Sequence, residues 1–371
     1  MLIKCTGVKN MFKSIVAIFT AIVSFIGGCF SNINDAIFFP EGPQTESVVF
    51  AEKIGNGWNL GNTLDACNLE KEEKMGLESE IYWGNPYTTK EMIEAVKAAG
   101  FSSVRIPITW TPHMDENYTI DKAWLNRVKE IADMVLDCGM YAIINVHHDD
   151  RFWLITDEEH EERATLILTT LWAQVSEHFK DYDEHLVFET MNEPRVVGDE
   201  NEWSGTDEYF EVVNRLNHAV LDVIRKSGGN NTTRFVMMPA YAARCEKETI
   251  SEVRLPDDEH IFFSVHFYPG TAHRSEFLDC EKKLSLKEKS EIYHTIRNFY
   301  KFFIKKGYGV VLGEYGWTDR TNLENLAERA DFLLSTANSF GIPCIVWDNG
   351  ADFRLFDRQT QTLEFPDYIK P

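Results

Sequence analysis

The sequence predicts an α/β protein with the fold of a single-domain (β/α)8 TIM barrel. Eight short apolar runs alternate with longer segments in which apolar residues recur at helical spacing. Several runs are almost continuously apolar, such as YAIINV and FVMM, which is typical of parallel strands covered on both faces. The 371 residues suffice for one barrel, whose usual size is about 250 residues or more, and no repeat or linker-like segment divides them.

The eight predicted strands are short runs rich in β-branched and aromatic residues. They cover residues 57–60, 103–108, 141–147, 186–191, 235–239, 261–268, 309–314 and 344–347.

Helical patterns follow most of these strands. Thr88 and Glu91 have the spacing of a capping box, and the pattern behind them ends at Gly100. The pattern after the fifth strand is the weakest of the series. Further apolar stripes lie within residues 124–136, 168–179, 210–224, 292–303 and 323–337.

The first thirty residues have the layout of an export signal. Three lysines precede an apolar stretch at residues 14–30, in which Gly27 and Gly28 are small residues near a cleavage site. This stretch is shorter than the roughly 20 apolar residues that span a bilayer. Residues 26–29 also resemble a lipobox, in which Cys29 would be lipidated after cleavage and would attach the protein to a membrane. We therefore expect a secreted or cell-surface protein.

The chain is thus expected to have three parts. Residues 1–30 are a signal peptide or lipoprotein leader, residues 31–44 a short N-terminal segment, and residues 45–371 the barrel domain. Hydrophobic residues make up 44% of the chain and charged residues 26%, which indicates an ordinary globular body. The formal net charge of −22 excludes nucleic acid as a partner, because phosphate backbones would be repelled.

The cysteines outside the leader show neither CxxC pairing nor the spacing of metal ligands. We expect all of them to be structural thiols, with a bridge between Cys245 and Cys280 as the alternative. They are Cys67, Cys138, Cys245, Cys280 and Cys344.

Polar and aromatic residues gather where the predicted strands end. The C-terminal ends of barrel strands and the loops after them form the active sites of this fold. In chain order, the residues there are Asn59, Asn62, Arg105, Trp110, His113, His147, His148, Asn192, Glu193, His266, Tyr268, Glu314, Trp347 and Asn349.

Glu193 and Glu314 end strands on opposite sides of the predicted barrel mouth. Paired carboxyl groups that flank a glycosidic bond are the requirement of glycoside hydrolysis, in which one donates a proton and the other attacks or stabilises the sugar. Arg105 lies in a buried strand and therefore needs a carboxylate neighbour. If that neighbour is Glu314, Arg105 lowers its pKa and keeps it ionised, and the resulting anion helps to keep Glu193 neutral.

A metal-dependent hydrolase is the sharpest alternative, because His147, His148, Asp149 and Asp150 are all metal-ligating residue types. We disfavour it, because consecutive histidines on a strand point to opposite faces and would not bind the same ion. The second alternative is a surface glycan-binding protein without turnover, which the presence of both glutamates disfavours.

Eight blocks of the sequence together resemble glycoside hydrolase family 5, a family of retaining (β/α)8 cellulases. The resemblance runs from about residue 45 to residue 355 in family order, and the wording is most similar to subfamily 4. The blocks are GWNLGNTLDA, WGNP, VRIPITW, NVHHDD, FETMNEPR, VHFYPG, LGEYGW and VWDNG.

The resemblance implies a role for each site residue. Glu193 corresponds to the acid/base and Glu314 to the nucleophile, while Asn192 would hold the sugar 2-hydroxyl. The remaining assignments are orienting residues His266 and Tyr268, support residues Arg105 and His147, the stacking residue Trp347, and Asn59, His113 and His148 along the cleft. Residues 271–290 depart from the subfamily, because they are charged rather than aromatic, and this leaves fine specificity open.

We expect an endo-acting, retaining β-1,4-glucanase that works as a monomer on cellulose, mixed-linkage glucan or xyloglucan, without cofactor or metal. A β-mannanase or a xylanase on the same site remains the alternative within the enzyme class.

Overall fold

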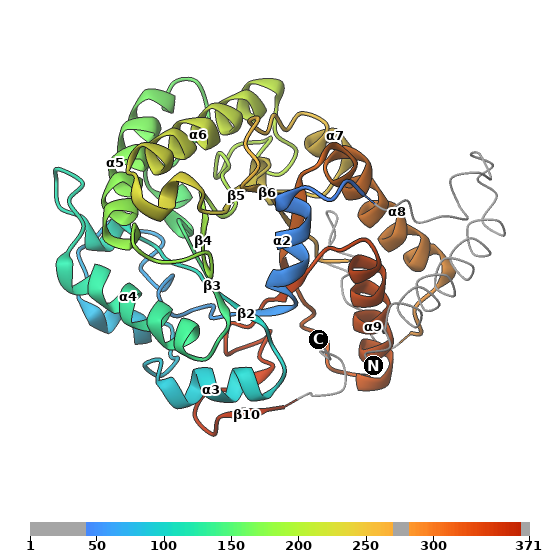
Figure 1. The fold of residues 1–371 in the computed structure, drawn as a ribbon. Helices are drawn as coiled ribbons and strands as arrows, with labels where there is room; N and C mark the ends of the chain where they lie inside the picture. The colour runs from blue at the N-terminus through green and yellow to red at the C-terminus, as the bar shows by residue number, and fades with distance from the viewer. Residues whose placement is uncertain (1–41, 270–281, 365–371) are drawn as a thin grey trace, which may run out of the picture.

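The computed structural model describes residues 42–269 and 282–364. Within these ranges, eight parallel strands form a closed barrel in chain order from β1 to β8, with helices around them (Figure 1). The predicted (β/α)8 fold is confirmed. The predicted leader, Cys29 and Cys280 lie outside the described residues, so the division of the chain into three parts stays a prediction.

The barrel closes through hydrogen bonds between β1 and β8, in which Gly57 aligns with Ile345. All eight predicted strands are present. They are β1 (Gly57–Asn59), β2 (Ser103–Ile106), β3 (Tyr141–Asn145), β4 (Leu186–Glu189), β5 (Val236–Pro239), β6 (Ile261–His266), β7 (Gly309–Tyr315) and β8 (Cys344–Val346), followed by a separate antiparallel pair, β9 (Phe356–Asp357) and β10 (Thr362–Leu363).

The helices surround the barrel, except for α2, which covers one end of it. They are α2 (Glu46–Ile54), α3 (Lys90–Ala98), α4 (Lys122–Asp137), α5 (Glu161–Phe179), α6 (Asp207–Lys226), α7 (Lys247–Ile250), α8 (Leu286–Phe302) and α9 (Leu323–Ser339). The weak pattern after the fifth strand corresponds to α7, which has only 4 residues. The predicted capping box of α3 is wrong by one position, because Thr89, not Thr88, accepts the hydrogen bond from the Met92 backbone.

Short 3-10 helices occupy several loops between these elements. They are η2 (Leu77–Ile81), η3 (Thr111–His113), η4 (His148–Arg151), η5 (Gly229–Thr232), η6 (Tyr241–Ala243) and η7 (Ile304–Lys306).

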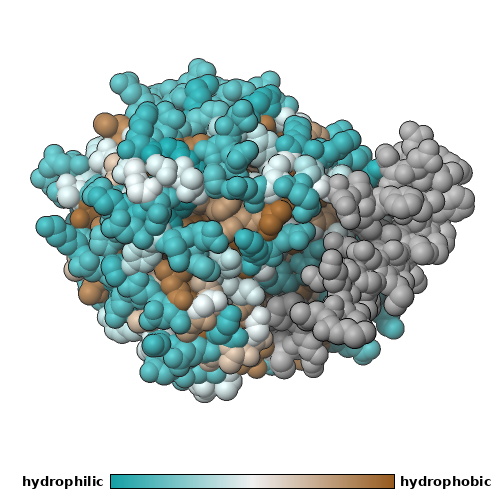
Figure 2. All heavy atoms as spheres, in the orientation of Figure 1, coloured by the Kyte–Doolittle hydropathy of each residue, from teal (hydrophilic) through white to brown (hydrophobic). Residues whose placement is uncertain are grey.

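Helix α2, which the sequence analysis did not predict, covers the N-terminal end of the barrel; Figure 1 shows it across the barrel opening. Ser47 Oγ accepts a hydrogen bond from the backbone of Gly309 at the start of β7 and donates to the carbonyl of Ile261 at the start of β6. Phe50 stacks on Phe235 with ring centroids 3.8 Å apart. In the same orientation, Figure 2 shows a largely hydrophilic surface with apolar residues near its centre, where Figure 1 places α2.

The barrel interior is built in layers that follow the two-residue period of the strands. The lower layer is apolar and packs on Phe50 of α2. It consists of Ile143, Val187, Met237, Phe262, Val311 and Ile345, from six successive strands. Two residues further along their strands, Asn145, Glu189 and Ser264 form a buried polar layer. The apolar layer that stabilises the fold therefore lies nearer the N-terminal ends of the strands, and the polar layer lies nearer their C-terminal ends.

The structure also bears on the cysteine and membrane expectations. Cys67, Cys138, Cys245 and Cys344 are free thiols. Within the described ranges, no helix has the length and apolarity needed to cross a bilayer.

Phe50→Ala is expected to lower the free energy of unfolding by about 3–5 kcal/mol, because it removes a buried ring from an aromatic stack and leaves a cavity. Val49→Ala, on the exposed side of the same helix, is the control and should change stability by less than about 1 kcal/mol. Thermal and denaturant unfolding of both variants would measure this. Equal effects would mean that α2 does not support the barrel core.

Candidate active site

A cleft with a volume of about 1120 Å³ lies at the C-terminal end of the barrel strands. Eight of the predicted site residues line it: His147, His148, Asn192, Glu193, His266, Tyr268, Glu314 and Trp347. The barrel therefore brings together side chains that are far apart in the sequence.

Arg105 on β2 is the centre of the buried polar layer beneath this cleft. Its Nε donates to Glu189 at 2.7 Å, and its Nη1 donates to Glu314 at 2.8 Å and to Asn59 at 2.9 Å. Its Nη2 donates to the side-chain oxygen of Asn192 at 2.7 Å. The predicted pairing of Arg105 with Glu314 is confirmed. Because a buried guanidinium must be fully paired, these contacts fix the partner side chains relative to one another.

Glu189 is a second partner of Arg105 that the sequence analysis did not single out. It is fully buried, and it also accepts hydrogen bonds from Asn145 at 2.9 Å and from Ser264 at 2.6 Å. A signal for it existed in the sequence. Glu189 directly follows the apolar run 186–188, so it belongs to a buried strand, where a carboxylate needs a cationic partner.

Glu314 at the end of β7 is contacted by donors on both carboxylate oxygens. Arg105 donates to Oε1, and the hydroxyl of Tyr268 donates to Oε2 at 2.7 Å, as the family resemblance implied. The register between β6 and β7 shifts after Val265, so that His266 aligns with Glu314. Irregularities of this kind at a barrel rim re-aim side chains. This one brings His266 Nδ1 to 3.6 Å from Glu314 Oε2.

Glu193 lies close to Glu314 in the cleft. Its Oε1 is 2.8 Å from His266 Nδ1, and its Oε2 is 3.4 Å from Arg195 Nη1. A carboxylate oxygen of Glu193, one of Glu314 and a ring nitrogen of His266 all lie within 4.8 Å of one another. The convergence of the two glutamates, on which the predicted chemistry depends, is therefore confirmed.

The charge state of Glu193 differs from the expected one. Burial raises its pKa, but the hydrogen bond and charge of His266, together with the charge of Arg195, outweigh burial and lower the pKa to about 2. The pKa of His266 is raised above its ordinary value, because the charges of Glu314 and Glu193 outweigh the opposite effect of burial. These pKa directions favour an ionised Glu193 in the protein alone, whereas a neutral Glu193 was expected.

Arg195 lies in the loop between β4 and α6 and connects Glu193 to Asp150, which follows β3. Its Nη1 lies 2.7 Å from Asp150 and donates to the backbone carbonyl of Glu193 at 3.0 Å, while its Nε donates to Glu202 at 3.1 Å. Burial raises the pKa of Asp150 to about 7, against the opposing charge of Arg195. The sequence analysis assigned no role to Arg195 and considered Asp150 only as a metal ligand, because nothing in their spacing shows that they form a pair.

The model of the cellulase family, glycosyl hydrolase family 5, matches residues 66–353 of the chain. The chain belongs to glycosyl hydrolase family 5. The family predicted from the motifs is confirmed.

Two curated family 5 relatives are similar to the chain over most of its length. Endoglucanase A from Clostridium longisporum is 41% identical over 328 residues, which cover 85% of this chain and 63% of that protein. Cellulase/esterase CelE from Acetivibrio thermocellus is 40% identical over 335 residues, which cover 87% of this chain and 40% of that protein. The chain thus spans less than two thirds of the length of these relatives.

A solved structure shows the same likeness. It is a GH5-4 broad specificity endoglucanase from Ruminococcus champanellensis with bound cellotriose. This chain matches it with a TM-score of 0.81 and 35% identity, over 88% of this chain and 98% of that chain. The subfamily of that protein agrees with the predicted resemblance to subfamily 4.

Two residues that the family 5 resemblance placed along the cleft do not line it. Asn59 is fully buried beneath the cleft, where its Nδ2 donates to the carbonyl of Gly313 at 2.9 Å. His113 is buried elsewhere, stacked on Trp124 with ring centroids 3.5 Å apart. The predicted position is wrong for both. Asn59 orients Arg105, and His113 packs against a helix.

His147 and His148 do not point to opposite faces of a strand, contrary to what was expected. The four residues of the metal-hydrolase alternative nevertheless do not form one site. Strand β3 ends at Asn145, so His147 and His148 lie beyond it, and their rings are 4.5 Å apart. Asp149 instead accepts hydrogen bonds from the backbone of residues 110 and 111, and Asp150 pairs with Arg195. The four residues therefore do not form one ligand set.

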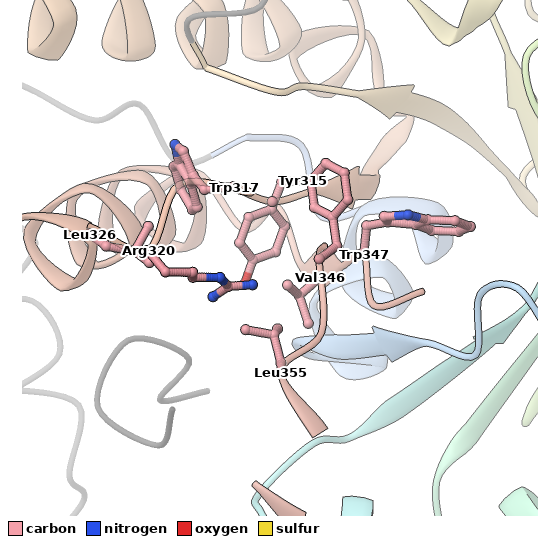
Figure 3. Close-up of a pocket in the computed structure, with 9 residues that line it drawn as sticks. Tyr315, Trp317, Arg320, Leu326, Val346, Trp347 and Leu355 are labelled. Atoms are coloured by element: carbon pink, nitrogen blue, oxygen red, sulfur yellow. The ribbon is translucent and has the colours of Figure 1, made fainter. Parts of the chain in front are cut away.

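Trp347, the predicted stacking residue of the family 5 site, lies parallel to the His147 ring at a centroid distance of 5.7 Å. Gly61 permits this position, because a Cβ there would lie 2.8 Å from the indole. A separate cavity of about 10 Å³ lies among Tyr315, Arg320 and their neighbours; Figure 3 shows the Trp347 indole extending away from these two side chains. That volume holds at most one water, so this cavity is too small for a sugar.

The segment 271–290, which departs from the family pattern, lies partly outside the described residues. Its described part includes the start of α8, where Lys287 and Glu288 line the cleft. The expectation that this segment borders the cleft is therefore confirmed for these residues.

The contribution of Asp150 to the free energy of unfolding is expected to decrease between about pH 5.5 and pH 7.5. Burial raises the pKa of Asp150 to about 7 and those of Asp65 and Asp149 to about 6. Below these values each of the three carboxyl groups holds its proton more tightly in the folded protein than in the unfolded chain, so its contribution to stability decreases as the pH rises through this range. Asp150→Asn should remove the contribution of Asp150, so that the difference in stability between the two pH values changes by on the order of 1–2 kcal/mol in favour of the higher pH. Thermal unfolding at the two pH values, with the exposed Asp331→Asn as control, would measure it.

An unchanged pH dependence in Asp150→Asn would contradict this account, because it would mean that Asp150 does not titrate in the range.

Proposed function

We propose that the protein is an endo-acting, retaining β-1,4-glucanase in which Glu314 is the nucleophile and Glu193 the acid/base. One observation carries the proposal: oxygens of the two carboxylates lie within 4.8 Å of each other at the floor of a large cleft. Retaining glycosidases have carboxyl groups about 5–5.5 Å apart, whereas inverting enzymes need about 6.5–9.5 Å to admit a water. The separation in this site is therefore closer to that of retaining enzymes.

In the first step, a Glu314 oxygen attacks the anomeric carbon, and the bond to the leaving sugar oxygen breaks. The product is a glycosyl ester on Glu314. Arg105 and Tyr268 hold the two oxygens of Glu314, so the attacking atom is positioned before the substrate arrives.

Glu193 must be protonated when the leaving oxygen departs. Its proton is available from His266 Nδ1, 2.8 Å from Glu193 Oε1. Substrate that covers Glu193 removes it from water and favours its neutral form, so the proton moves from His266 to Glu193 and then to the leaving oxygen. In the second step, Glu193 takes a proton from the water that hydrolyses the ester.

Asn192 is oriented to bind the sugar. Its side-chain oxygen accepts from Arg105, so its amide NH2 group is the end left to donate to a substrate hydroxyl. A hydrogen bond to the 2-hydroxyl strengthens in the transition state of glycoside hydrolysis.

The open cleft supports internal cleavage of a long polysaccharide, and the relatives named endoglucanases support a β-1,4-glucan as that polysaccharide. We further propose export to a secreted or cell-surface location, supported by the apolar stretch after basic residues at the start of the chain, and action as a monomer.

Proton NMR of a freshly cleaved β-linked cello-oligosaccharide is expected to show the β-anomer of the product first, because two displacements at one carbon restore its configuration. A first-formed α-anomer would remove Glu314 from its role as nucleophile.

Glu314→Gln is expected to abolish turnover of every substrate. Glu193→Gln should lower turnover of polysaccharide by about 10²–10⁴-fold but spare the first-turnover burst of a good leaving group, such as 2,4-dinitrophenolate from its β-cellobioside, because that group needs no proton. Steady-state release should then be slow, because hydrolysis of the glycosyl ester needs Glu193 as base. Glu200→Gln, which changes an exposed carboxylate on the same loop, is the control. Polysaccharide rates close to wild type in either catalytic variant would refute the assignment.

A panel of polysaccharides tests the substrate class. We expect reducing sugar from carboxymethylcellulose, mixed-linkage glucan or xyloglucan, and more of it than from mannan or xylan. A preference for mannan or xylan would favour the alternative enzyme, and binding without any product would favour a glycan-binding protein.

A further inference from the structure

We infer that Tyr241 is a positioning residue for Glu193 and acts on it through the loop between β4 and α6. The inference rests on the proposed function, because it concerns the residue assigned there as the acid/base. Tyr241 begins η6, shortly after β5, and is not among the described residues that line the cleft. Any effect of Tyr241 on catalysis must therefore pass through the residues that it contacts.

The Tyr241 hydroxyl contacts the loop that begins at Glu193. The backbone N–H of Val196 donates to this hydroxyl at 3.2 Å. The hydroxyl in turn donates to the backbone carbonyl of Asn201 at 3.5 Å. Burial raises the pKa of Tyr241 to about 12, so the hydroxyl keeps the proton that it donates. One side chain thus joins two points of the loop.

Two aromatic side chains of α6 hold the Tyr241 ring. Tyr209 stacks on it with ring centroids 5.8 Å apart, and Phe210 meets it edge to face at the same distance. The Tyr241 side chain is buried. A buried ring that is packed between other rings keeps one orientation, so its hydroxyl is a fixed point for the loop.

The backbone after Tyr241 adopts a costly conformation. Ala242 has φ 49° and ψ 25°, and Ala243 has φ 47°. Both lie in the left-handed region, which residues with a Cβ rarely adopt. Such strain persists only where the surrounding contacts enforce it, and it is concentrated at functional sites. The N–H groups of Ala243 and Arg244 close the turn by bonding to carbonyls three residues earlier.

The Ala242 N–H is directed instead at the residue after Glu193. It donates to the backbone carbonyl of Pro194 at 2.9 Å. On the other side of Glu193, the N–H of Asn192 donates to the carbonyl of Val146 at 2.8 Å. These contacts come from the segments after β5 and β3, the two neighbours of β4 in the barrel. Glu193 therefore lies between two backbone hydrogen bonds, and the strained turn supplies one of them.

The position of Glu193 matters most when the leaving group needs a proton. A displacement of about 1 Å in a catalytic group lowers the rate on the order of 10²-fold. Loss of one loop contact among several should displace Glu193 by less, so we expect a smaller effect. A substrate whose leaving group departs without a proton should be insensitive to the change.

Tyr241→Phe removes the hydroxyl and keeps the ring. It is expected to lower kcat on polysaccharide by about tenfold, with KM within about twofold of wild type, because Tyr241 does not touch the substrate. The first-turnover burst of dinitrophenolate from 2,4-dinitrophenyl β-cellobioside should stay within about twofold of wild type. Tyr308→Phe is the matched control, because its hydroxyl also donates to a backbone carbonyl, that of Pro256, away from the cleft. It should behave as wild type in both assays.

A double variant tests whether Tyr241 acts through Glu193. In the Glu193→Gln background, Tyr241→Phe should lower the polysaccharide rate by less than about twofold, because the group that it positions is already lost. A merely structural residue would lower the rate by the same factor in both backgrounds. Unfolding temperatures of all variants, measured alongside, should lie above the assay temperature.

Three results would overturn the inference. They are a polysaccharide kcat of Tyr241→Phe close to wild type, an equal loss in the dinitrophenolate burst, and an undiminished loss in the Glu193→Gln background. A Glu193→Gln variant with wild-type polysaccharide rates would instead refute the proposed function, so the two failures are distinguishable.

Discussion

The buried guanidinium of Arg105 is the constraint on which the rest of the site depends. It has no contact with water, so each of its donors needs an acceptor, and it finds them in Glu189, Glu314, Asn59 and Asn192. Glu189 and Glu314 cannot turn toward solvent without leaving Arg105 unpaired. Removal of one partner would leave an unpaired buried ion, which is strongly destabilising. The geometry of Glu314 and Asn192 is therefore enforced by electrostatics.

The layered interior explains how this barrel carries a dense set of charges and remains stable. The polar layer lies directly on an apolar layer, and α2 seals the apolar layer from below through Phe50. The charged groups thus face the open end of the barrel only. Packing at the closed end supplies the stability that the buried charges reduce.

The barrel, the two glutamates and the pairing of Arg105 with Glu314 could be predicted from the sequence. Other parts of the fold and the site could not, for physical reasons. Strand runs and glycine-terminated helices are local patterns, so the barrel and the two glutamates at its rim were found. Helix α2 was missed, because it precedes β1 and so lies outside the alternation of strands and helices on which the prediction was based. The contact of His266 with both glutamates could not be found from the sequence, because it depends on distances of 2.8 Å and 3.6 Å that tertiary packing sets.

Contacts between loops were the least predictable part of the site. The pairing of Arg195 with Asp150 joins the segments after β4 and β3, and neither residue lies in a periodic pattern. His113 shows the opposite error, since a histidine near a strand end was assigned to the cleft but packs on Trp124. Sequence position thus predicts which strand end a side chain follows, and the rotamer that decides its surroundings is set by tertiary packing.

The register shift after Val265 is needed to position His266 in the site, but the barrel fold does not depend on it. Upstream of it, β6 is an ordinary strand whose hydrogen bonds need only an unbroken backbone. Downstream, one residue of slippage would point His266 away from both glutamates. Homologues that kept the barrel and lost this single irregularity would look intact in sequence length and core composition, yet they would be inert scaffolds. Inspection of this one position would tell such proteins from working enzymes.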